Sequence, residues 1–394
     1  MEILISGASI AGPALAFWLS KDGHKVTIVE RAPELRDGGY KVDIRGAAIE
    51  VARRMGILEE IRAASTNMRE ARWVDRDNRT LAVLPADFFE GRTGDDEEIM
   101  RGDLARILYD RTKDVVEYVF GDSIAALDEG PDGVLVSFER GPDRRFDLVI
   151  GADGLHSRVR ALTFGDEAQF VKHLGAYVSI YTTPNYLNLD YAELFYGSVD
   201  RLVSVYSARD NSEARSLFIF NSPRLDFDRR DAKSVLAQHF DGESWETPRL
   251  LEFMRDANDF YFDSVSLVEM PGWSRGRVTL VGDAASCPSP ASGQGTGLAL
   301  VGAYVLAGEL AAAGGDHVAA FACYERIMRP YAQANQKFAR RAVKAFTATT
   351  PGQVRVRNAM MRVLHYMPWK GALAAPTTRL LQRAANDVEL KSYQ

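Results

Sequence analysis

The first residues of the chain whose types and spacing could do chemistry lie directly after its start. Glu2 to Ser6 form a short, mostly apolar run, and the turn Gly7-Ala8-Ser9-Ile10-Ala11-Gly12 follows it and opens a helical pattern. In a strand, turn and helix unit of this kind, the first glycine permits a sharp bend, the middle position approaches a pyrophosphate, and the last glycine lets helix and strand pack closely. The pattern predicts a phosphate-binding turn whose members are Gly7, Ser9, Ile10, Ala11 and Gly12.

The middle position of this turn carries Ser9 instead of glycine. Serine is tolerated where φ is negative, its hydroxyl can donate to a phosphate oxygen, and the positive end of the helix behind it stabilises an anion. A second strand pattern, Lys25 to Val29, ends in Glu30 and Arg31, and Glu30 lies 18 residues beyond Gly12. A carboxylate there accepts hydrogen bonds from an unphosphorylated ribose. We therefore expect a dinucleotide, with a ligand-free turn and a solvated Glu30 as the alternative.

A second group of residues with chemical potential lies near position 290. The buried strand pattern VTLVG ends in Asp283, which places a carboxylate at the carboxyl edge of the sheet, where open α/β folds bind ligands. The loop that follows contains Gly293-Gln294-Gly295 and opens a helix, so N–H groups and a positive dipole end face that edge. A ligand that spans both groups must be long, carry a polyol, and have an end that is stabilised by positive potential. FAD has these properties.

The elements that must position these residues suggest two packed domains, because 394 residues exceed what one core usually supports. The predicted fold class is α/β: a Rossmann-like FAD-binding domain with a mostly parallel sheet, an inserted substrate domain with a largely antiparallel sheet, and C-terminal helices. The alternating runs LVSVYSA and SLFIFN indicate the antiparallel part. We assign residues 1–69, 98–166 and 271–345 to the FAD-binding domain, 70–97 and 167–270 to the substrate domain, and 346–394 to a helical segment that is broken at Pro351-Gly352 and Pro368. A further helix break is expected at Pro330.

Composition excludes several classes of protein and site. A net charge of -6 argues against nucleic acid as a partner. The two cysteines, Cys287 and Cys323, form no CxxC pair or metal-ligand cluster, so neither a disulfide framework nor a metal site is expected, and a reducing cytoplasm fits. The apolar stretch from Leu298 to Gly308 is too short to span a membrane and is followed by Glu309. We expect a cytoplasmic protein without a transmembrane segment or a secretory leader, either a monomer or a homodimer.

Four motifs together give the chain a family resemblance. They are GASIAG with Glu30, RGDL at Arg101, GADGLHSRVR at 151–160, and VGDAASCPSPASGQG at 281–295. In order and spacing they resemble the class A flavoprotein monooxygenases of the p-hydroxybenzoate hydroxylase type, nearest the branch with tetracycline-inactivating monooxygenases. The resemblance covers about residues 1–345. Two positions depart from the pattern, Ser9 in the first turn and Ser286 after GDAA, where many relatives carry an aromatic residue or histidine.

The resemblance implies a role for each matching residue. It places the pyrophosphate on the Gly7 to Gly12 turn and the adenosine ribose on Glu30. It further implies NADPH contact at Arg36, flavin contact at Asp43, FAD contact at Arg101 and Asp283, contact with FAD and NADPH at Asp153 and Gly154, and packing on the flavin ring by Pro290 and Gly293, beside Gln294 and Gly295. The alternative for each of these residues, taken singly, is an ordinary surface charge or turn residue.

The resemblance also implies the reaction. NADPH, or alternatively NADH, reduces the FAD, O₂ forms a flavin C4a-hydroperoxide, and an aromatic or polyketide-like small molecule is hydroxylated, with no catalytic side chain assigned because the flavin carries the chemistry. We predict that Tyr206, Phe218 and Phe220 line the substrate pocket. A reductase or dehydrogenase, a halogenase and a non-catalytic binding protein are the alternatives. The halogenase lacks support because its W-x-W signature is missing, since every tryptophan is isolated.

Overall fold

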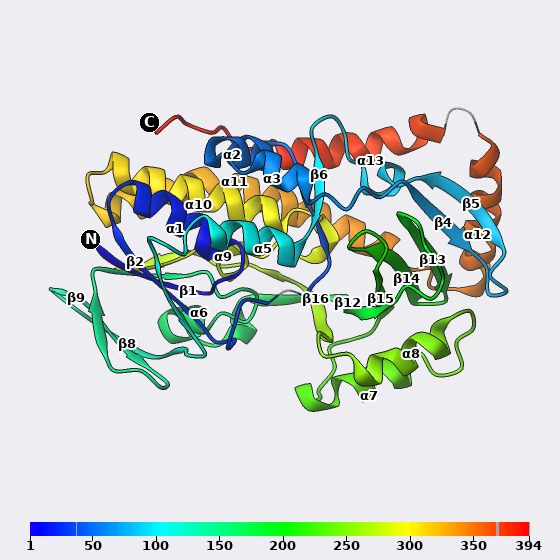
Figure 1. Ribbon diagram of the computed structural model, residues 1–394, viewed down its shortest axis with the longest axis horizontal. Helices are drawn as coiled ribbons and strands as arrows, with labels where there is room; N and C mark the ends of the chain where they lie inside the picture. The colour runs from blue at the N-terminus through cyan, green and yellow to red at the C-terminus, as the bar shows by residue number, and fades with distance from the viewer. Residues whose placement is uncertain (37, 368–369, 394) are drawn as a thin grey trace.

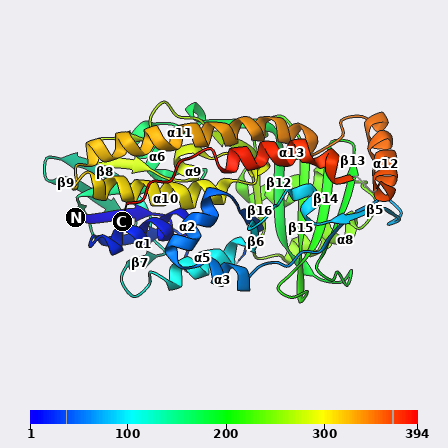
Figure 2. The same cartoon turned by 90° about the horizontal axis from the view of Figure 1, so that it is seen from above.

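A computed structural model describes residues 1–36, 38–367 and 370–393. The molecule is elongated, with a parallel sheet at one end, a large antiparallel sheet at the other, and two long helices running between them (Figure 1). Both chain termini lie at the parallel-sheet end, as Figures 1 and 2 agree. The predicted α/β class is confirmed.

The first sheet has six strands in the order β17-β18-β11-β1-β2-β7. Its members are β1 (Glu2–Ser6), β2 (Lys25–Glu30), β7 (Glu117–Phe120), β11 (Leu148–Gly151), β17 (Ser274–Arg275) and β18 (Val278–Leu280). Central β1 pairs in parallel with both β2 and β11, with Ile5 opposite Ile28 and Ile150. Such strands are apolar throughout because both faces of the sheet are covered.

Helices cover one face of the six-stranded sheet, and a small sheet covers the other. On the first face α1 (Ala11–Lys21) packs against α10 (Gly295–Ala312), which also contacts α2 (Ala47–Met55) and α11 (His317–Ala342). On the second lie α6 (Arg158–Phe164) and the strands β8 (Ile124–Gly130), β9 (Gly133–Phe138) and β10 (Arg144–Phe146). The order of β1 and β11 at the centre brings the ends of β1, β2 and β18 to one edge.

Two features of the long helices concern the sequence predictions. By length and composition α10 could cross a membrane, but 83% of it is buried inside the protein, as in the core helix of a folded domain. The predicted break at Pro330 is wrong, because α11 continues through it. The buried residues Met328, Tyr331 and Ala332 around Pro330 hold the helix by packing, which offsets the cost of a proline, about 3 kcal/mol.

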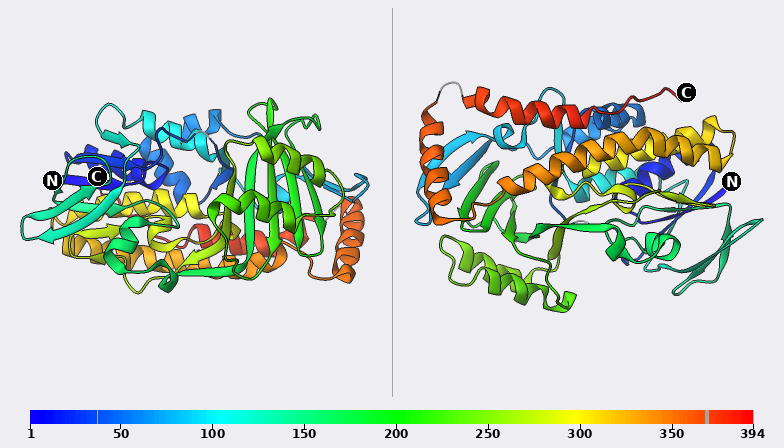
Figure 3. Two further views of the ribbon diagram at one scale, coloured as in Figure 1. Left: turned by 90° about the horizontal axis from the view of Figure 1, so that it is seen from below. Right: turned by 180° about the vertical axis from the view of Figure 1, so that it is seen from behind.

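The second large sheet has seven strands in the order β16-β12-β15-β14-β13-β4-β5. Its members are β4 (Glu70–Val74), β5 (Thr80–Pro85), β12 (Val171–Pro184), β13 (Ala192–Ser198), β14 (Arg201–Ala208), β15 (Glu213–Asn221) and β16 (Tyr261–Val268). One face is covered by α7 (Ala232–His239) and α8 (Thr247–Asp256), as Figure 3 shows from below and behind. The other face looks toward the two-stranded sheet of β3 (Lys41–Ile44) and β6 (Glu97–Met100).

The C-terminal helices tie the two ends of the molecule together. Helix α12 (Pro351–Tyr366) lies beside the edge strand β5, where the N–H of Val83 donates to Nδ1 of His365 at 3.2 Å, so the helix covers an edge that would otherwise be open. Helix α13 (Lys370–Ala385) then returns along α11 toward the N-terminal end. The remaining short helices are α3 (Leu58–Ala63), α4 (Asp87–Glu90), α5 (Arg101–Asp110) and α9 (Asp283–Ser286), with 3-10 turns at Glu167–Gln169, Arg229–Asp231, Pro290–Ser292 and Val343–Ala345.

Candidate active site

The turn after β1 has the tight geometry that its glycines predict. Gly7 has a φ of +109°, and a Cβ on it would lie 2.5 Å from the carbonyl oxygen of Ala152. A Cβ on Gly12 would lie 2.0 Å from the carbonyl oxygen of Gly7, so only glycine lets α1 begin so close to the turn. Ser9 does not have a positive φ, and its Oγ accepts a hydrogen bond from Nη2 of Arg101 at 2.7 Å. The turn therefore accommodates serine and joins two of the predicted site residues.

Two long helices begin at this site without a side-chain cap. The residue before α1 is Ile10 and the residue before α10 is Gln294; neither side chain accepts a hydrogen bond from the helix, and neither first turn contains an acidic residue. The helices α6, α11 and α12 are capped by Ser157, Asp316 and Thr350, whereas α2, α3, α5, α7 and α8 also lack a side-chain cap, so the position of α1 and α10 at the sheet edge is what sets them apart. Uncapped N–H groups with a positive dipole end are what an anionic ligand requires.

The two uncapped helix starts lie next to each other. Gly282 separates them: a Cβ on this residue would lie 3.1 Å from Cβ of Ala11 in α1 and 3.7 Å from Cβ of Ala299 in α10. A single extended ligand can therefore contact both, with its phosphates at α1 and a second electron-rich group at α10.

Buried polar atoms without a hydrogen bond lie around the same edge. They include Oδ1 of Asp283 and Nε2 of Gln294, whereas Oδ1 of Asp43 accepts no hydrogen bond but lies 3.6 Å from Nη1 of Arg92. A Cβ on Gly293 would lie 3.7 Å from Oδ2 of Asp43, and one on Gly295 would lie 3.7 Å from Oδ1 of Asp283, so these predicted residues share one place. Leaving a buried polar atom unpaired costs about 1–3 kcal/mol, which a ligand with hydroxyl and ring N–H groups would remove. The residues present fit the ribityl and ring portions of FAD.

The two carboxyls at this edge have raised pKa values. Burial raises the pKa of Asp283, and the positive charge of Arg101 opposes the rise. Burial also raises the pKa of Asp43, against the nearby guanidinium of Arg45, whose Nη2 lies 2.6 Å from Oδ2 of Asp43. Two buried carboxyls facing arginines are typical of a ligand site.

The adenosine end of the predicted site is more open. The carboxylate of Glu30 accepts the N–H of Ala8 at 3.0 Å and the N–H of Ala32 at 2.9 Å, which holds it beside the turn. Nη2 of Arg36 lies 3.7 Å from Oε1 of Glu30, and both Arg36 and Arg31 are at the exposed rim. The structure thus brings Glu30 to the cradle and leaves the two arginines outside it.

Asp153 stabilises the local structure of its motif through hydrogen bonds. Its carboxylate accepts the hydroxyl of Ser157 at 2.5 Å and the N–H groups of Arg158 and Val159 at 2.8 and 3.1 Å, so it holds the start of α6. Gly154 beside it has a φ of +80°, which favours glycine. Contact of these two residues with cofactor stays a prediction.

His156 of the same motif was missed by sequence reasoning. Its Nδ1 lies 2.9 Å from the carboxylate of Glu167, and its Nε2 lies 3.0 Å from Oδ2 of Asp263 on β16. Hydrogen bonds to both carboxylates raise the pKa of His156 to about 9. The histidine therefore carries a charge near neutral pH and links the first sheet region to the second sheet.

The seven-stranded sheet presents Tyr206 on the face that looks toward β3, and a contact of this residue with substrate stays a prediction. Its hydroxyl accepts the N–H of Lys41 at 3.2 Å. Arg215 and Leu217 on the neighbouring strand have the same parity, and Nε of Arg215 donates to the carbonyl of Gly39 at 3.3 Å. Neither Arg215 nor Leu217 was predicted.

The prediction for Phe218 and Phe220 is corrected by their placement. Both rings are buried on the opposite face, where Phe218 contacts Phe240 at 4.9 Å between ring centroids and Phe220 contacts His239 at 4.2 Å. Successive residues of a strand point to opposite faces, so these two even-numbered residues pack under α7 and α8 while Leu217 faces away from those helices. They are core residues of the outer layer.

A buried ion pair joins β3 to the large sheet. Nζ of Lys41 lies 2.9 Å from Oε2 of Glu193 on β13 and 3.1 Å from Oε2 of Glu98 on β6. Ser204 donates to the other carboxylate oxygen of Glu193 at 2.5 Å. No sequence signal could have paired these residues, because the contact depends on how the two sheets dock.

Comparison with known proteins identifies the family. A family model described as an FAD binding domain matches residues 1–339. The chain belongs to this family. It is an FAD-dependent monooxygenase, and a flavin-dependent monooxygenase of an unknown prokaryotic organism is 44% identical over 353 residues, which cover 89% of this chain and 91% of that relative.

Two solved structures resemble this FAD-dependent monooxygenase in fold over nearly the full length of both chains. The tetracycline destructase Tet(51) is 37% identical with a TM-score of 0.87, and the alignment covers 100% of this chain and 99% of that one. The tetracycline destructase Tet(55) is 39% identical with a TM-score of 0.85, covering 99% and 98%. The class A resemblance is thereby confirmed. Among the residues that the structure describes, no group of three His, Cys, Asp or Glu side chains could hold a metal ion.

Proposed function

We propose that this monooxygenase hydroxylates a fused-ring, tetracycline-like polyketide or a related aromatic molecule, with O₂ as oxygen source and NADPH, or alternatively NADH, as hydride donor. The observation that carries the proposal is the apolar sheet face on the cofactor side. Phe195 and Leu217 there pack in one cluster with Ala291 of the flavin loop and with Met361 and Leu364 of α12. The similarity to two tetracycline destructases over the full chain supports the fused-ring substrate.

The proposed FAD contacts follow the geometry described above. The pyrophosphate lies between the Gly7 to Gly12 turn and Arg101, and the adenosine ribose lies at Glu30. Asp283 and Gln294 supply their unpaired polar atoms to the ribityl chain and the flavin ring. The further contacts proposed from the motifs are Ile10, Ala11, Asp43, Asp153, Gly154, Pro290, Gly293 and Gly295, with Arg31 and Arg36 at the rim for the nicotinamide donor.

FAD, when bound, accepts a hydride and supplies electrophilic oxygen derived from O₂. The uncapped start of α10 stabilises negative charge at the cofactor edge through its N–H groups and dipole. The apolar cluster around Phe195 excludes water, which protects a reactive oxygen species from being wasted. Arg215 is buried on the same face, and its Nη2 lies 2.8 Å from Oε1 of Glu213, so its charge is already paired within the protein.

We also propose the two-domain division of residues 1–69, 98–166 and 271–345 from 70–97 and 167–270. It is supported by the composition of the two sheets, because the seven-stranded sheet takes all of its strands from the second set. A cytoplasmic location suits the two free cysteines and the supply of reduced nicotinamide.

The test is steady-state oxidation of NADPH and NADH by the purified holoenzyme, with and without tetracycline. We expect slow oxidation alone, acceleration by tetracycline, and a product that has gained oxygen, because closure over the flavin commits the cycle to substrate. Unchanged oxidation and unmodified tetracycline would refute the fused-ring proposal. Fast oxidation that releases only peroxide would favour the reductase alternative.

A further inference from the structure

Helix α12 is held on the seven-stranded sheet by one face only. Met361 and Leu364 on that face pack against the apolar cluster of the sheet. The helix has a formed start, because the hydroxyl of Thr350 accepts the N–H of Gln353 at 3.2 Å and Pro351 lies in the first turn. The helix is therefore already folded and fixed in place when its opposite face meets a partner.

The opposite face of α12 exposes an apolar stripe. Its members are Val356, Met360, Val363 and Tyr366, whose exposed fractions are 60%, 64%, 55% and 82%. Their spacing of four, three and three residues places them along one side of the helix. Single exposed apolar residues are ordinary on a protein surface, whereas a contiguous row of them marks an interaction site.

Unpaired positive charge borders the apolar stripe. Arg355 and Arg362 are exposed, and neither forms an ion pair with a residue that the structure describes. Each directly precedes a stripe residue, Val356 or Val363, so both lie along the same edge of the stripe. Residues 326–386, which include α12, contain twelve Lys or Arg and no Asp or Glu, in a chain whose net charge is -6. The stripe and its two arginines therefore form a basic amphipathic surface.

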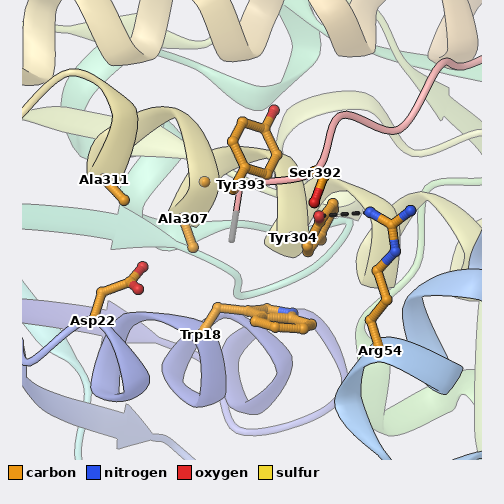
Figure 4. Close-up of a pocket in the computed structure, with 9 residues that line it drawn as sticks. Trp18, Asp22, Arg54, Tyr304, Ala307, Ala311, Ser392 and Tyr393 are labelled. Carbon is orange, nitrogen blue, oxygen red and sulfur yellow. Dashed lines mark hydrogen bonds between the residues drawn. The ribbon is translucent and has the colours of Figure 1, made fainter.

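Other arginines of the molecule have their charge neutralised within the protein. Nη2 of Arg340 on α11 lies 2.7 Å from Oε1 of Glu269. At the parallel-sheet end, Nε of Arg54 lies 2.8 Å from Oε1 of Glu50, and its Nη1 donates to the hydroxyl of Tyr304, as Figure 4 shows. The charges on α12 differ from these because they lie in solvent beside an apolar stripe.

The position of α12 restricts what can cover its exposed face. The helix lies at the end of the elongated molecule, across the long axis and away from the chain termini (Figures 1 and 2). The turn of residues 75–79 at the same end has two arginines and two aspartates and adds no net charge. Because the sheet occupies the inner face of α12, a partner cannot enclose the helix in a groove, but a flat surface can lie on it.

A second copy of the chain fits this face poorly. A two-fold contact through α12 would bring four arginines together with no acidic residue of the helix to pair them. A flat surface with negative charge and an apolar layer beneath it satisfies both the arginines and the stripe. The surface of an anionic lipid bilayer has these properties.

From these observations we propose that α12 docks the enzyme on the surface of an anionic lipid bilayer. The apolar stripe enters the boundary between headgroups and acyl chains, and Arg355 and Arg362 contact lipid phosphates. The helix has 16 residues and lies in the plane of the membrane without crossing it. None of the predicted FAD contacts belongs to α12, so the cradle stays outside the contact.

The test is flotation of the holoenzyme with vesicles of phosphatidylcholine alone, or of phosphatidylcholine and phosphatidylglycerol in equal parts. We expect binding to the mixed vesicles to be at least about tenfold tighter, because each basic residue near an anionic surface contributes about fivefold to the binding constant. High salt should weaken it. Equal binding to both vesicles would overturn the proposal. No binding to the mixed vesicles would also overturn it and would leave a protein as the occupant of the face.

Two matched pairs of variants locate the contact. Val363 on α12 and Val318 in the first turn of α11 are exposed valines, at 55% and 67%. We expect Val363→Asp to abolish flotation with the mixed vesicles and Val318→Asp to preserve it. Arg362→Ala should weaken binding about fivefold, whereas Arg145→Ala, at an exposed position of β10, should not. Equal effects within either pair would contradict the assignment.

Two controls complete the experiment. All four substituted side chains are exposed, so flavin content and unfolding temperature should match those of the unsubstituted enzyme and show that the variants are folded. Light scattering in solution should give the same molecular mass for the unsubstituted enzyme and Val363→Asp. A dimer that Val363→Asp dissociates would show that a second copy covers the stripe, and would overturn the proposal.

Discussion

Two adjacent residues of β15 provide a sharp test of which sheet face holds the substrate. Leu217 is partly exposed on the cofactor side, whereas Phe218 is fully buried under α7 and α8. We predict that Leu217→Ala weakens substrate use with little loss of stability. Phe218→Ala should instead lower stability and leave substrate use unchanged. The neighbouring positions control for each other, because they share one strand and one set of backbone hydrogen bonds.

The expected magnitudes follow from burial. The ring of Phe218 is 0% exposed and contacts Phe240 and Tyr181, with centroids 4.9 and 5.8 Å away. Its removal should lower the free energy of unfolding by about 3–5 kcal/mol. Truncation of the partly buried Leu217 should cost about 1 kcal/mol of stability, and its lost contact with an apolar substrate should lower kcat/KM about tenfold.

The assay combines urea unfolding in excess FAD with NADPH oxidation at varied tetracycline concentration. For Leu217→Ala we expect a higher KM at a nearly unchanged unfolding midpoint. For Phe218→Ala we expect a lower midpoint with an unchanged KM for the fraction that remains folded. A raised KM in Phe218→Ala together with an unaffected KM in Leu217→Ala would refute the assignment of the two faces.

Three further predictions concern the cofactor cradle and the link between the sheets. Gly12→Ala should abolish FAD retention, measured by flavin absorbance after gel filtration, since its Cβ would lie 2.0 Å from the carbonyl oxygen of Gly7; full occupancy would show that α1 can retreat. Gly295→Asp, whose Cβ would lie 3.7 Å from Oδ1 of Asp283, should lower the flavin reduction potential and slow reduction by NADPH. The isosteric Gly295→Asn should change both less. Identical potentials in the two variants would show that the added charge has no effect on the flavin. Because its pKa is raised to about 9, His156 should stabilise the fold fully below pH 6.5 and lose that contribution as pH rises through 9. The free energy of unfolding should therefore fall over this pH range in the unsubstituted enzyme, and fall less in His156→Gln. Parallel pH profiles of the two proteins would contradict this.

Local constraints made the cradle predictable from sequence. The bend at Gly7 and the close approach at Gly12 are backbone requirements that only glycine satisfies, so residue type alone marks them. The position of Glu30 follows equally, because it ends the strand next to β1 and accepts the N–H of Ala8 in the turn. Domain boundaries and cofactor contacts of the individual residues stay predictions.

The sequence did not indicate which face of the seven-stranded sheet each residue of β15 points to. In SLFIFN apolar residues succeed one another because both faces of the sheet are covered, so no alternation distinguishes Leu217 from Phe218. A clue was present in the helical pattern near Ala232 to Phe240, which needs an apolar partner on one face. The contacts of His156 with Asp263 and of Lys41 with Glu193 join residues far apart in sequence and depend on docking of the two sheets.

The central claim is that the enzyme transfers one oxygen atom from O₂ to a fused-ring substrate held on the cofactor side of the seven-stranded sheet. The most direct measurement is turnover of tetracycline under ¹⁸O₂ with mass analysis of the product, and a parallel reaction in H₂¹⁸O under ordinary O₂. The account predicts one labelled atom in the product from ¹⁸O₂ and none from labelled water. A turnover product that takes its label from water, or carries no new oxygen, would contradict it.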